Sequence, residues 1–375
     1  MKKRMIALAL ALTLALSLTA CGGGSTSTPG TVGSNPASTS GSNPGSTSTP
    51  QDAGEFNPDY AADAMTIEEL RAANGVEVTV PANAELAVVM KSLSNEFWRT
   101  LEEGYQQAAS DAGITIEVNA TTSENDEILQ QTMTENFTTG GKTALMLSPI
   151  SDSNLTSAVE SANAAGVLTV NVNDGLIAQA NHYVGPNAAQ NGELAAAWLS
   201  EKLGDQGEVA IVIGMPKAFA ARQRTAGFKQ WIADNNSGLT VVEEQNADWD
   251  RNQAKTIAAN WIQNHPDLKG IFCNNDTMAL GVVEAVKEAN ADILVVGVDG
   301  IGEAYESIRN GGLSATIDSF PFYMGQIATE VTLRSLNGET IPSVVQTPQA
   351  LIDSTNVDTD AATIINWVAP TYKAG

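Results

Sequence analysis

The stretch AELAVVMKSLSNEFW, residues 84–98, decides the fold class of this chain. Apart from Glu85, residues 84–90 are all apolar, which is typical of a strand buried on both faces of a parallel sheet. Ser94 and Asn95 are favoured helix N-cap residues, and apolar residues recur at helical spacing from Phe97 until Gly113. The stretch therefore predicts a buried strand, a polar turn and an amphipathic helix.

The same unit repeats along the chain. Further short apolar runs predict strands at 115–120, 143–147, 167–172, 209–213, 240–243, 270–273, 293–298 and 314–317. Helical stretches lie between most of them. Alternating short strands and helices indicate an α/β protein whose parallel sheets are covered on both faces.

Polar and aromatic residues follow these predicted strands, at the ends where α/β folds bind ligands. They are asparagines, aspartates, arginines and aromatic residues. Amides, carboxylates and guanidinium groups exchange hydrogen bonds with paired hydroxyls, while aromatic faces cover the C–H faces of a sugar ring. The pattern is typical of polyol recognition.

Several motifs occur in order and carry a resemblance: LSNEFW (93–98), SP (148–149), ARQR with GF (221–228), ADWD (247–250), ND with MALG (275–281) and VGVDG (296–300). Through them, about residues 84–350 resemble the periplasmic sugar-binding proteins of the ribose-binding type. The resemblance implies the type 1 periplasmic-binding-protein fold, with two doubly wound parallel-sheet lobes joined by a three-strand hinge. It also implies a receptor for an ABC importer.

The resemblance implies roles for single residues. Asn95 matches a polar contact to hydroxyls, and Phe97 and Trp98 match aromatics that flank the ring. Arg224 matches an arginine that bridges ring oxygen and hydroxyls. The predicted ligand-binding residues are Asn95, Phe97, Trp98, Asn171, Arg224, Trp249, Asn275 and Asp299, and the secondary candidates are Asp174, Arg222, Asp318 and Ser319.

Other roles stay open for some of these residues. Phe97 fits a core position, Asn95 and Asn275 fit helix caps, and Asp299 fits an Asp-Gly turn. The chain also departs from the family's ribose binders, which carry an Asp-Arg pair where this chain has Asn171-Val172, and a hinge glutamine where it has Ser319. Losing that ion pair removes strong charge-assisted hydrogen bonds, so ribose is disfavoured, and Asn173, Asp174 or Asp318 are candidates to replace the pair.

Composition excludes several classes of partner. The formal net charge of −24 argues against nucleic acid and against adsorption on anionic lipid. Of the two cysteines, Cys273 lies in an apolar run and is expected to be a buried structural thiol. With two histidines and no Cys/His cluster, we expect no metal site and no cofactor. We expect a monomer.

The amino-terminal segment predicts the location of the protein. Lys2, Lys3 and Arg4 precede an apolar run of signal-peptide length, and residues 18–21, LTAC, resemble a bacterial lipobox. Cys21 is then the lipidated first residue of an extracytoplasmic lipoprotein, although an ordinary secretory signal is the alternative. Residues 22–50 are almost entirely Gly, Ser, Thr, Pro and Asn, a composition too polar to fold.

The predicted boundaries follow from these segments. Residues 1–21 form the signal peptide and 22–80 a disordered tether. Residues 81–187 with 320–347 form the N-terminal lobe, and 188–319 with 348–375 form the C-terminal lobe. The only membrane contact expected is the lipid anchor.

The function predicted is capture of a monosaccharide or similar polyol for an ABC transporter permease, without catalysis. A sensory receptor of the same fold, feeding chemotaxis or a sensor kinase, is the alternative. A secreted glycoside hydrolase is disfavoured because the conspicuous carboxylates follow separate strands beside aromatics. A sugar-responsive transcription regulator would need a helix-turn-helix where the signal and tether stand.

We predict that Cys21→Ala releases the protein from membranes or blocks its maturation, because the acyl chains would have no attachment atom. Membrane fractionation of cells that express the wild type or the variant measures this. Unchanged membrane association of the variant would contradict the lipoprotein assignment.

Overall fold

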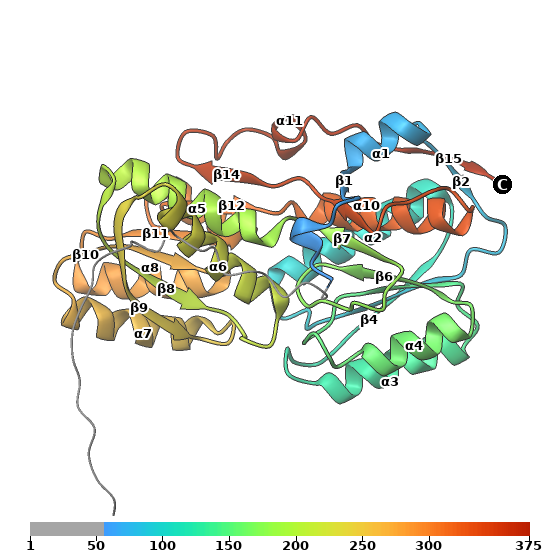
Figure 1. The fold of residues 1–375 in the computed structure, drawn as a ribbon, viewed down its shortest axis with the longest axis horizontal. Helices are drawn as coiled ribbons and strands as arrows, with labels where there is room; N and C mark the ends of the chain where they lie inside the picture. The colour runs from blue at the N-terminus through green and yellow to red at the C-terminus, as the bar shows by residue number, and fades with distance from the viewer. Residues whose placement is uncertain (1–55) are drawn as a thin grey trace, which may run out of the picture. The chain divides into compact units, whose positions relative to one another are not determined.

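The computed structural model describes residues 56–375, so Cys21, the predicted signal peptide and residues 22–55 of the predicted tether lie outside the described residues. The described chain forms two α/β lobes, each built on its own sheet (Figure 1). The predicted fold class is therefore confirmed. None of the described helices is long and apolar enough to cross a bilayer.

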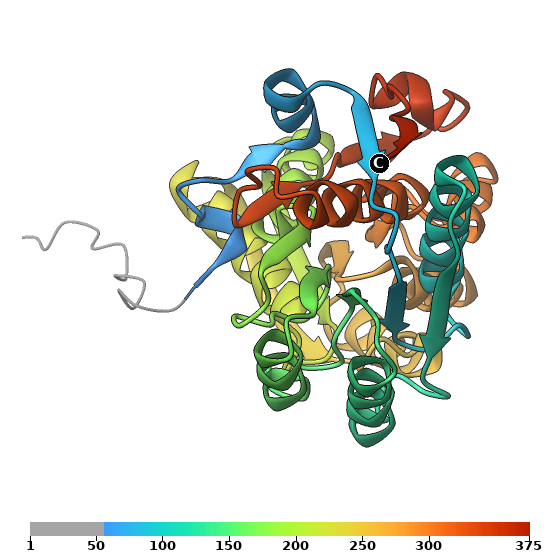
Figure 2. The ribbon, with the colours of Figure 1, turned by 90° about the vertical axis from the view of Figure 1, so that its right-hand side faces the viewer.

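The N-terminal lobe contains a seven-stranded parallel sheet. Its strands, in spatial order, are β1 (Met65–Thr66), β13 (Val344–Gln346), β7 (His182–Gly185), β6 (Leu168–Val172), β5 (Ala144–Leu147), β3 (Leu86–Met90) and β4 (Ile116–Ala120). Helices α2 (Glu96–Ala112) and α10 (Pro321–Leu336) cover one face, and α3 (Glu127–Thr139) and α4 (Thr156–Ala164) cover the other (Figure 2).

The continuous apolar run of β3 has a direct explanation in this layering. Leu86, Val88 and Met90 pack into the cluster that holds α2 and α10, whereas Ala87 and Val89 pack into the cluster that holds α3 and α4. Successive strand residues point to opposite faces, so a strand covered on both faces must be apolar at every position.

The C-terminal lobe contains a six-stranded sheet in which only the edge strand β14 runs antiparallel. Its strands, in spatial order, are β14 (Ala350–Asp353), β12 (Ala315–Asp318), β11 (Leu294–Asp299), β10 (Leu268–Cys273), β8 (Gln206–Ile213) and β9 (Gly238–Asn246). Its helices are α5 (Ala188–Leu203), α6 (Phe219–Asp234), α7 (Arg251–Asn264), α8 (Asp276–Ala289) and α9 (Gly302–Arg309). Cys273 is buried and forms no disulfide within residues 56–375, and burial raises the pKa of its thiol well above the usual range.

The chain passes between the two sheets three times between β7 and β14. It crosses from β7 to α5, returns from β12 to α10, and crosses again from β13 to β14. These short connections form the hinge between the lobes.

Both described ends of the chain differ from the predicted boundaries. Residues 56–80 are not a tether, because they form η1 (Pro58–Tyr60), β1, α1 (Ile67–Asn74) and β2 (Glu77–Val80). The last residues do not stay with the C-terminal lobe. After α11 (Ala361–Ile364), β15 (Thr371–Ala374) pairs with β2 beside α10, and Figure 1 shows this red segment running from β14 to β15.

A buried ion network fixes both ends to α10. Glu330 accepts hydrogen bonds from Arg71 of α1, at 2.6 Å from Nη2, and from Arg334. Arg71 also donates to the carbonyl of Val368 at 2.6 Å, and its guanidinium lies 4.7 Å from the centre of the Trp367 ring. Buried charges require such partners, so α1 and the C-terminal segment are held together through the same carboxylate.

Asp59 links the N-terminal segment to the other lobe. Its carboxylate accepts hydrogen bonds from the backbone N–H groups of Ala188 (2.8 Å) and Ala189 (3.0 Å), at the start of α5. A few residues later, β1 pairs with β13 of the N-terminal lobe. Residues 56–66 therefore contact both lobes beside the hinge.

We predict that Asp59→Asn changes how stability depends on pH. Burial raises the pKa of Asp59 from 3.8 to about 6, against the lowering effect of the two N–H donors. A carboxyl whose pKa is raised on folding stabilises the native state most below about pH 4, and this contribution is lost as the pH rises through about 6. The advantage of the wild type over Asp59→Asn should thus shrink by about 2–3 kcal/mol between pH 4 and pH 7.

Urea unfolding of both proteins across this pH range measures the difference directly. Other buried carboxyls titrate in both proteins and cancel in the comparison. A difference in unfolding free energy that does not change with pH would show that Asp59 ionises in the folded state as it does in the unfolded chain.

Candidate functional site

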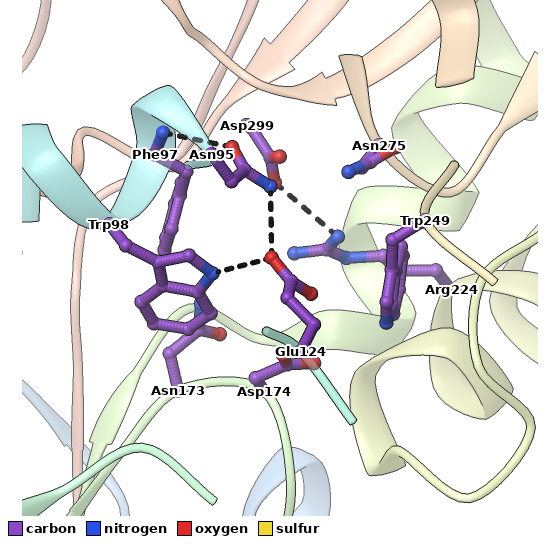
Figure 3. Close-up of a pocket in the computed structure, with 10 residues that line it drawn as sticks. All are labelled: Asn95, Phe97, Trp98, Glu124, Asn173, Asp174, Arg224, Trp249, Asn275 and Asp299. Atoms are coloured by element: carbon purple, nitrogen blue, oxygen red, sulfur yellow. Dashed lines mark hydrogen bonds and ion pairs between the residues drawn. The ribbon is translucent and has the colours of Figure 1, made fainter. Parts of the chain in front are cut away.

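A small cavity lies between the lobes, beyond the carboxyl ends of strands from both sheets. Figure 3 shows the side chains that line it. Its empty volume is about 280 Å³. Six of its lining residues come from the N-terminal lobe and four from the C-terminal lobe: Asn95, Phe97, Trp98, Glu124, Asn173 and Asp174, then Arg224, Trp249, Asn275 and Asp299. The cavity is lined by ionic, amide and aromatic groups from both halves.

The start of α2 builds one wall. Asn95 caps the helix, with its Oδ1 accepting a hydrogen bond from the Phe97 N–H at 3.1 Å. The rings of Phe97 and Trp98 meet edge to face, with centroids 4.9 Å apart. The helix cap and the ring contact both fix the positions of side chains that line the cavity. Asn95 thus caps α2 and lines the cavity as well.

A buried ion pair lies at the base of this wall. Lys91, which directly follows β3, is fully buried and its ammonium pairs with the carboxylate of Asp174. The Lys91 Nζ lies 5.8 Å from the centre of the Trp98 ring and 6.0 Å from that of Trp249. A cation within about 6 Å of an aromatic ring is attracted by its negative face, so Lys91 interacts with aromatic residues of both lobes.

The opposite wall begins with Arg224, in the second turn of α6. Its Nη1 donates to the carbonyl of Asn274 at 2.6 Å and lies 3.5 Å from Asp299 Oδ1. Its Nε is buried and has no hydrogen-bond partner within residues 56–375. A buried N–H group without an acceptor destabilises the fold. We therefore expect a bound ligand to supply the acceptor for Arg224 Nε.

Trp249 completes the wall after β9. Its backbone has a φ of 65°, and its indole Nε1 also has no partner among the described residues. A Cβ placed on Gly214 would lie 2.2 Å from this ring, so only glycine there permits the indole to take this position.

Asn275 and Asp299 supply the remaining polar atoms. Asn275 caps α8, with Oδ1 accepting from the Met278 N–H at 3.0 Å. Burial raises the pKa of Asp299 well above its usual range, although Arg224 lowers it. Behind it, burial raises the pKa of Asp276 to about 7. Hydrogen-bond donors stabilise carboxyl groups that are buried together in this way. A ligand with hydroxyl groups can provide such donors.

The structure brings together all the predicted ligand-binding residues except Asn171. Asn171 is fully buried: its amide donates to the Gly175 carbonyl at 3.1 Å and accepts from the Ile177 N–H at 2.8 Å. It therefore shapes the loop after β6 and does not line the cavity. The loop instead presents Asn173 and Asp174, both in left-handed backbone conformations.

Among the secondary candidates, only Asp174 lines the cavity. Arg222 pairs with Asp152 outside it. Asp318 is held by the Tyr305 hydroxyl at 2.8 Å and the Phe320 N–H at 2.6 Å. Ser319 is fully buried, and its hydroxyl has no partner within the described residues.

Two charged residues at the site were not predicted from the sequence. Lys91 is the first residue after the apolar strand β3, and Glu124 lies four residues beyond the end of β4. The carboxyl ends of parallel strands share one edge of a sheet, and ligands bind there. A charged residue just after a strand could therefore have been predicted to lie at the site.

Comparison with known proteins gives consistent matches. The family model described as "Periplasmic binding protein domain" matches residues 86–340. The ribose import binding protein of Bacillus subtilis (strain 168) is 35% identical over 267 residues, which cover 71% of this chain and 86% of that protein.

Solved structures match over a similar span. An ABC transporter periplasmic solute-binding protein from Actinobacillus succinogenes 130z, with bound D-allose, has a TM-score of 0.69 and 29% identity, covering 74% of this chain and 100% of the other. A solute-binding protein from Bacillus halodurans C-125, with bound myo-inositol, has a TM-score of 0.68 and 26% identity, covering 74% and 97%.

We predict that Asp299→Ala weakens ligand binding about tenfold to several hundredfold, because buried donors lose the carboxyl oxygens that accept from them, at a cost of about 1–3 kcal/mol or more. Trp249→Ala should also weaken binding, through the loss of stacking area. Calorimetry with a sugar or polyol that raises the wild-type melting temperature measures both effects.

The exposed Asp292→Ala is the matched control, and circular dichroism should stay native in every variant. Wild-type affinity in either Asp299→Ala or Trp249→Ala would mean that the ligand binds elsewhere.

Proposed function

The chain belongs to the periplasmic binding protein family as a solute-binding protein of a sugar ABC transporter, and on that premise we propose that it is an extracytoplasmic lipoprotein that delivers one monosaccharide or similar polyol to an importer. It is a binding protein and not an enzyme. The observation that carries the proposal is the cavity between the lobes, where paired polar groups and two tryptophans face one another.

The chemistry of the cavity suits a ring of hydroxyls. Asp174 and Asp299 accept hydrogen bonds, Arg224 donates, and Asn275 can do both. Trp98 and Trp249 offer apolar ring surface from opposite lobes. Alternating donors and acceptors beside aromatic rings match the two surfaces of a sugar.

The size of the cavity restricts the ligand. The cavity is small, with about 280 Å³ of space between the atoms that line it. This supports a single sugar or cyclitol over an oligosaccharide. The relatives bind, by their descriptions, ribose, D-allose and myo-inositol, all within this class.

The charged residues near the loop after β6 differ from those of the family's ribose binders. Asn171-Val172 replaces the Asp-Arg pair of the family's ribose binders, yet Lys91 and Asp174 still place a cation and a carboxylate at this side of the cavity. A ligand different from ribose is compatible with this changed geometry.

Contacts between the lobes close the cavity. Glu96 at the start of α2 accepts from the Gly302 N–H of α9 at 3.1 Å, and Lys217 pairs with Glu127 at 2.6 Å. Asp152 accepts from the Phe219 N–H of α6 at 3.0 Å. A ligand enclosed in this way reaches the cavity only if the lobes first separate at the hinge.

We predict that a saturating ligand reduces the radius of gyration, because its contacts to both lobes favour this closed arrangement over an open one. A thermal-shift screen of D-ribose, D-allose, D-tagatose and myo-inositol first identifies a ligand, since selective binding to the native state raises the melting temperature. Small-angle scattering with and without that ligand then measures closure.

L-alanine, which lacks the ring of hydroxyls, is the control compound. Identical scattering curves with a verified ligand would contradict hinge closure. A screen in which no sugar or polyol shifts the melting temperature would contradict the proposed function itself.

A further inference from the structure

Glu124 reaches into the cavity from the loop between β4 and α3. Figure 3 shows its carboxylate among Asn95, Trp98 and Arg224, near the middle of the labelled residues. This loop belongs to the N-terminal lobe, whereas Arg224 belongs to the C-terminal lobe. The carboxylate therefore lies where a ligand held by both lobes would meet it.

The two oxygens of this carboxylate have different surroundings. Oε1 accepts hydrogen bonds from the Trp98 indole N–H at 3.1 Å and from the Asn95 amide at 3.4 Å. Both of these hydrogen bonds go to Oε1, and within residues 56–375 none goes to Oε2. The first oxygen is thus fixed by two donors on α2, and the second keeps its acceptor capacity for a molecule in the cavity.

The charges around Glu124 define what that molecule can be. The cavity lining includes three carboxyl groups, Glu124, Asp174 and Asp299, against one guanidinium. Lys91 lies behind the lining and is already paired with Asp174. An anionic ligand would therefore place its acidic group among carboxyl oxygens in a buried site, where Arg224 already interacts with Asn274 and Asp299.

We propose that Glu124 is a ligand-contacting, specificity-determining residue, whose Oε2 accepts a hydrogen bond from a hydroxyl of a neutral monosaccharide or polyol and disfavours sugar acids and sugar phosphates. This inference rests on the proposed function and names the charge class of its ligand. Burial raises the pKa of Glu124, and the nearby Lys91 ammonium offsets part of this rise.

Glu124→Gln separates this role from a structural one. The amide of glutamine keeps an oxygen for the Trp98 and Asn95 donors but places an N–H₂ donor where Oε2 was an acceptor. A role limited to orienting Trp98 would survive this change, whereas the contact to a ligand hydroxyl would be lost. Glu124→Ala removes both roles, and the exposed Glu135→Gln on α3 is the matched control.

The test uses calorimetry with D-allose, D-ribose and myo-inositol, and then the monodeoxy forms of whichever binds the wild type most tightly. Glu124→Gln should lower that affinity by about tenfold to a hundredfold, as expected for a charge-assisted hydrogen bond. One monodeoxy form should bind the wild type weakly and lose no further affinity in Glu124→Gln, because the two changes remove the same contact. Glu135→Gln should bind as the wild type does.

Three results would overturn the inference. The first is wild-type affinity in Glu124→Gln together with weak binding in Glu124→Ala, which assigns Glu124 a structural role only. The second is full additivity between Glu124→Gln and every deoxy form. The third is binding of the matching uronic acid or phosphate ester as tightly as the neutral sugar. Failure of all neutral sugars to bind the wild type would instead overturn the proposed function, and this inference with it.

Discussion

Burial of both faces of each sheet is the constraint on which the rest of the molecule depends. Strands such as β3 and β10 have apolar neighbours on each side, so their faces offer no place for unpaired polar groups. In these strands the carboxyl ends are where such groups can lie. Since two sheets direct these ends toward one cavity, every charged or amide side chain there needs a partner from its own lobe, the other lobe or a ligand.

The partners present in the structure show how that need is divided. Lys91 and Asp174 satisfy each other within one lobe, and Arg224 is only partly satisfied by Asn274 and Asp299. Among the described residues, Arg224 Nε and Trp249 Nε1 have no hydrogen-bond partner. Removing one member of a buried pair is more costly than leaving a surface ion unpaired, so this cavity favours a ligand that completes its hydrogen bonds over a merely apolar one.

Local sequence pattern was enough for the strand–helix alternation. Together with the family resemblance it also predicted most of the candidate site, because those residues lie at strand ends or in the loops and helix turns that follow them. It failed for Asn171, whose hydrogen bonds to Gly175 and Ile177 depend on how a loop turns after β6. It also missed Glu124, because the loop from β4 to α3 brings this residue against the start of α2. The ordered residues 56–80 escaped prediction because Arg71 and β2 find their partners in α10 and β15, more than 200 residues away.

The course of the N-terminal segment has a mechanical consequence. Asp59 is fixed at the first turn of α5, immediately after the chain leaves β7 for the other lobe, and β1 lies beside the hinge strand β13. Points near a rotation axis travel least when two bodies turn about it. A pull transmitted through the residues that precede 56 therefore acts with a short lever arm and exerts little torque on either lobe. Anchorage at this end would leave the balance between open and closed forms to the ligand alone.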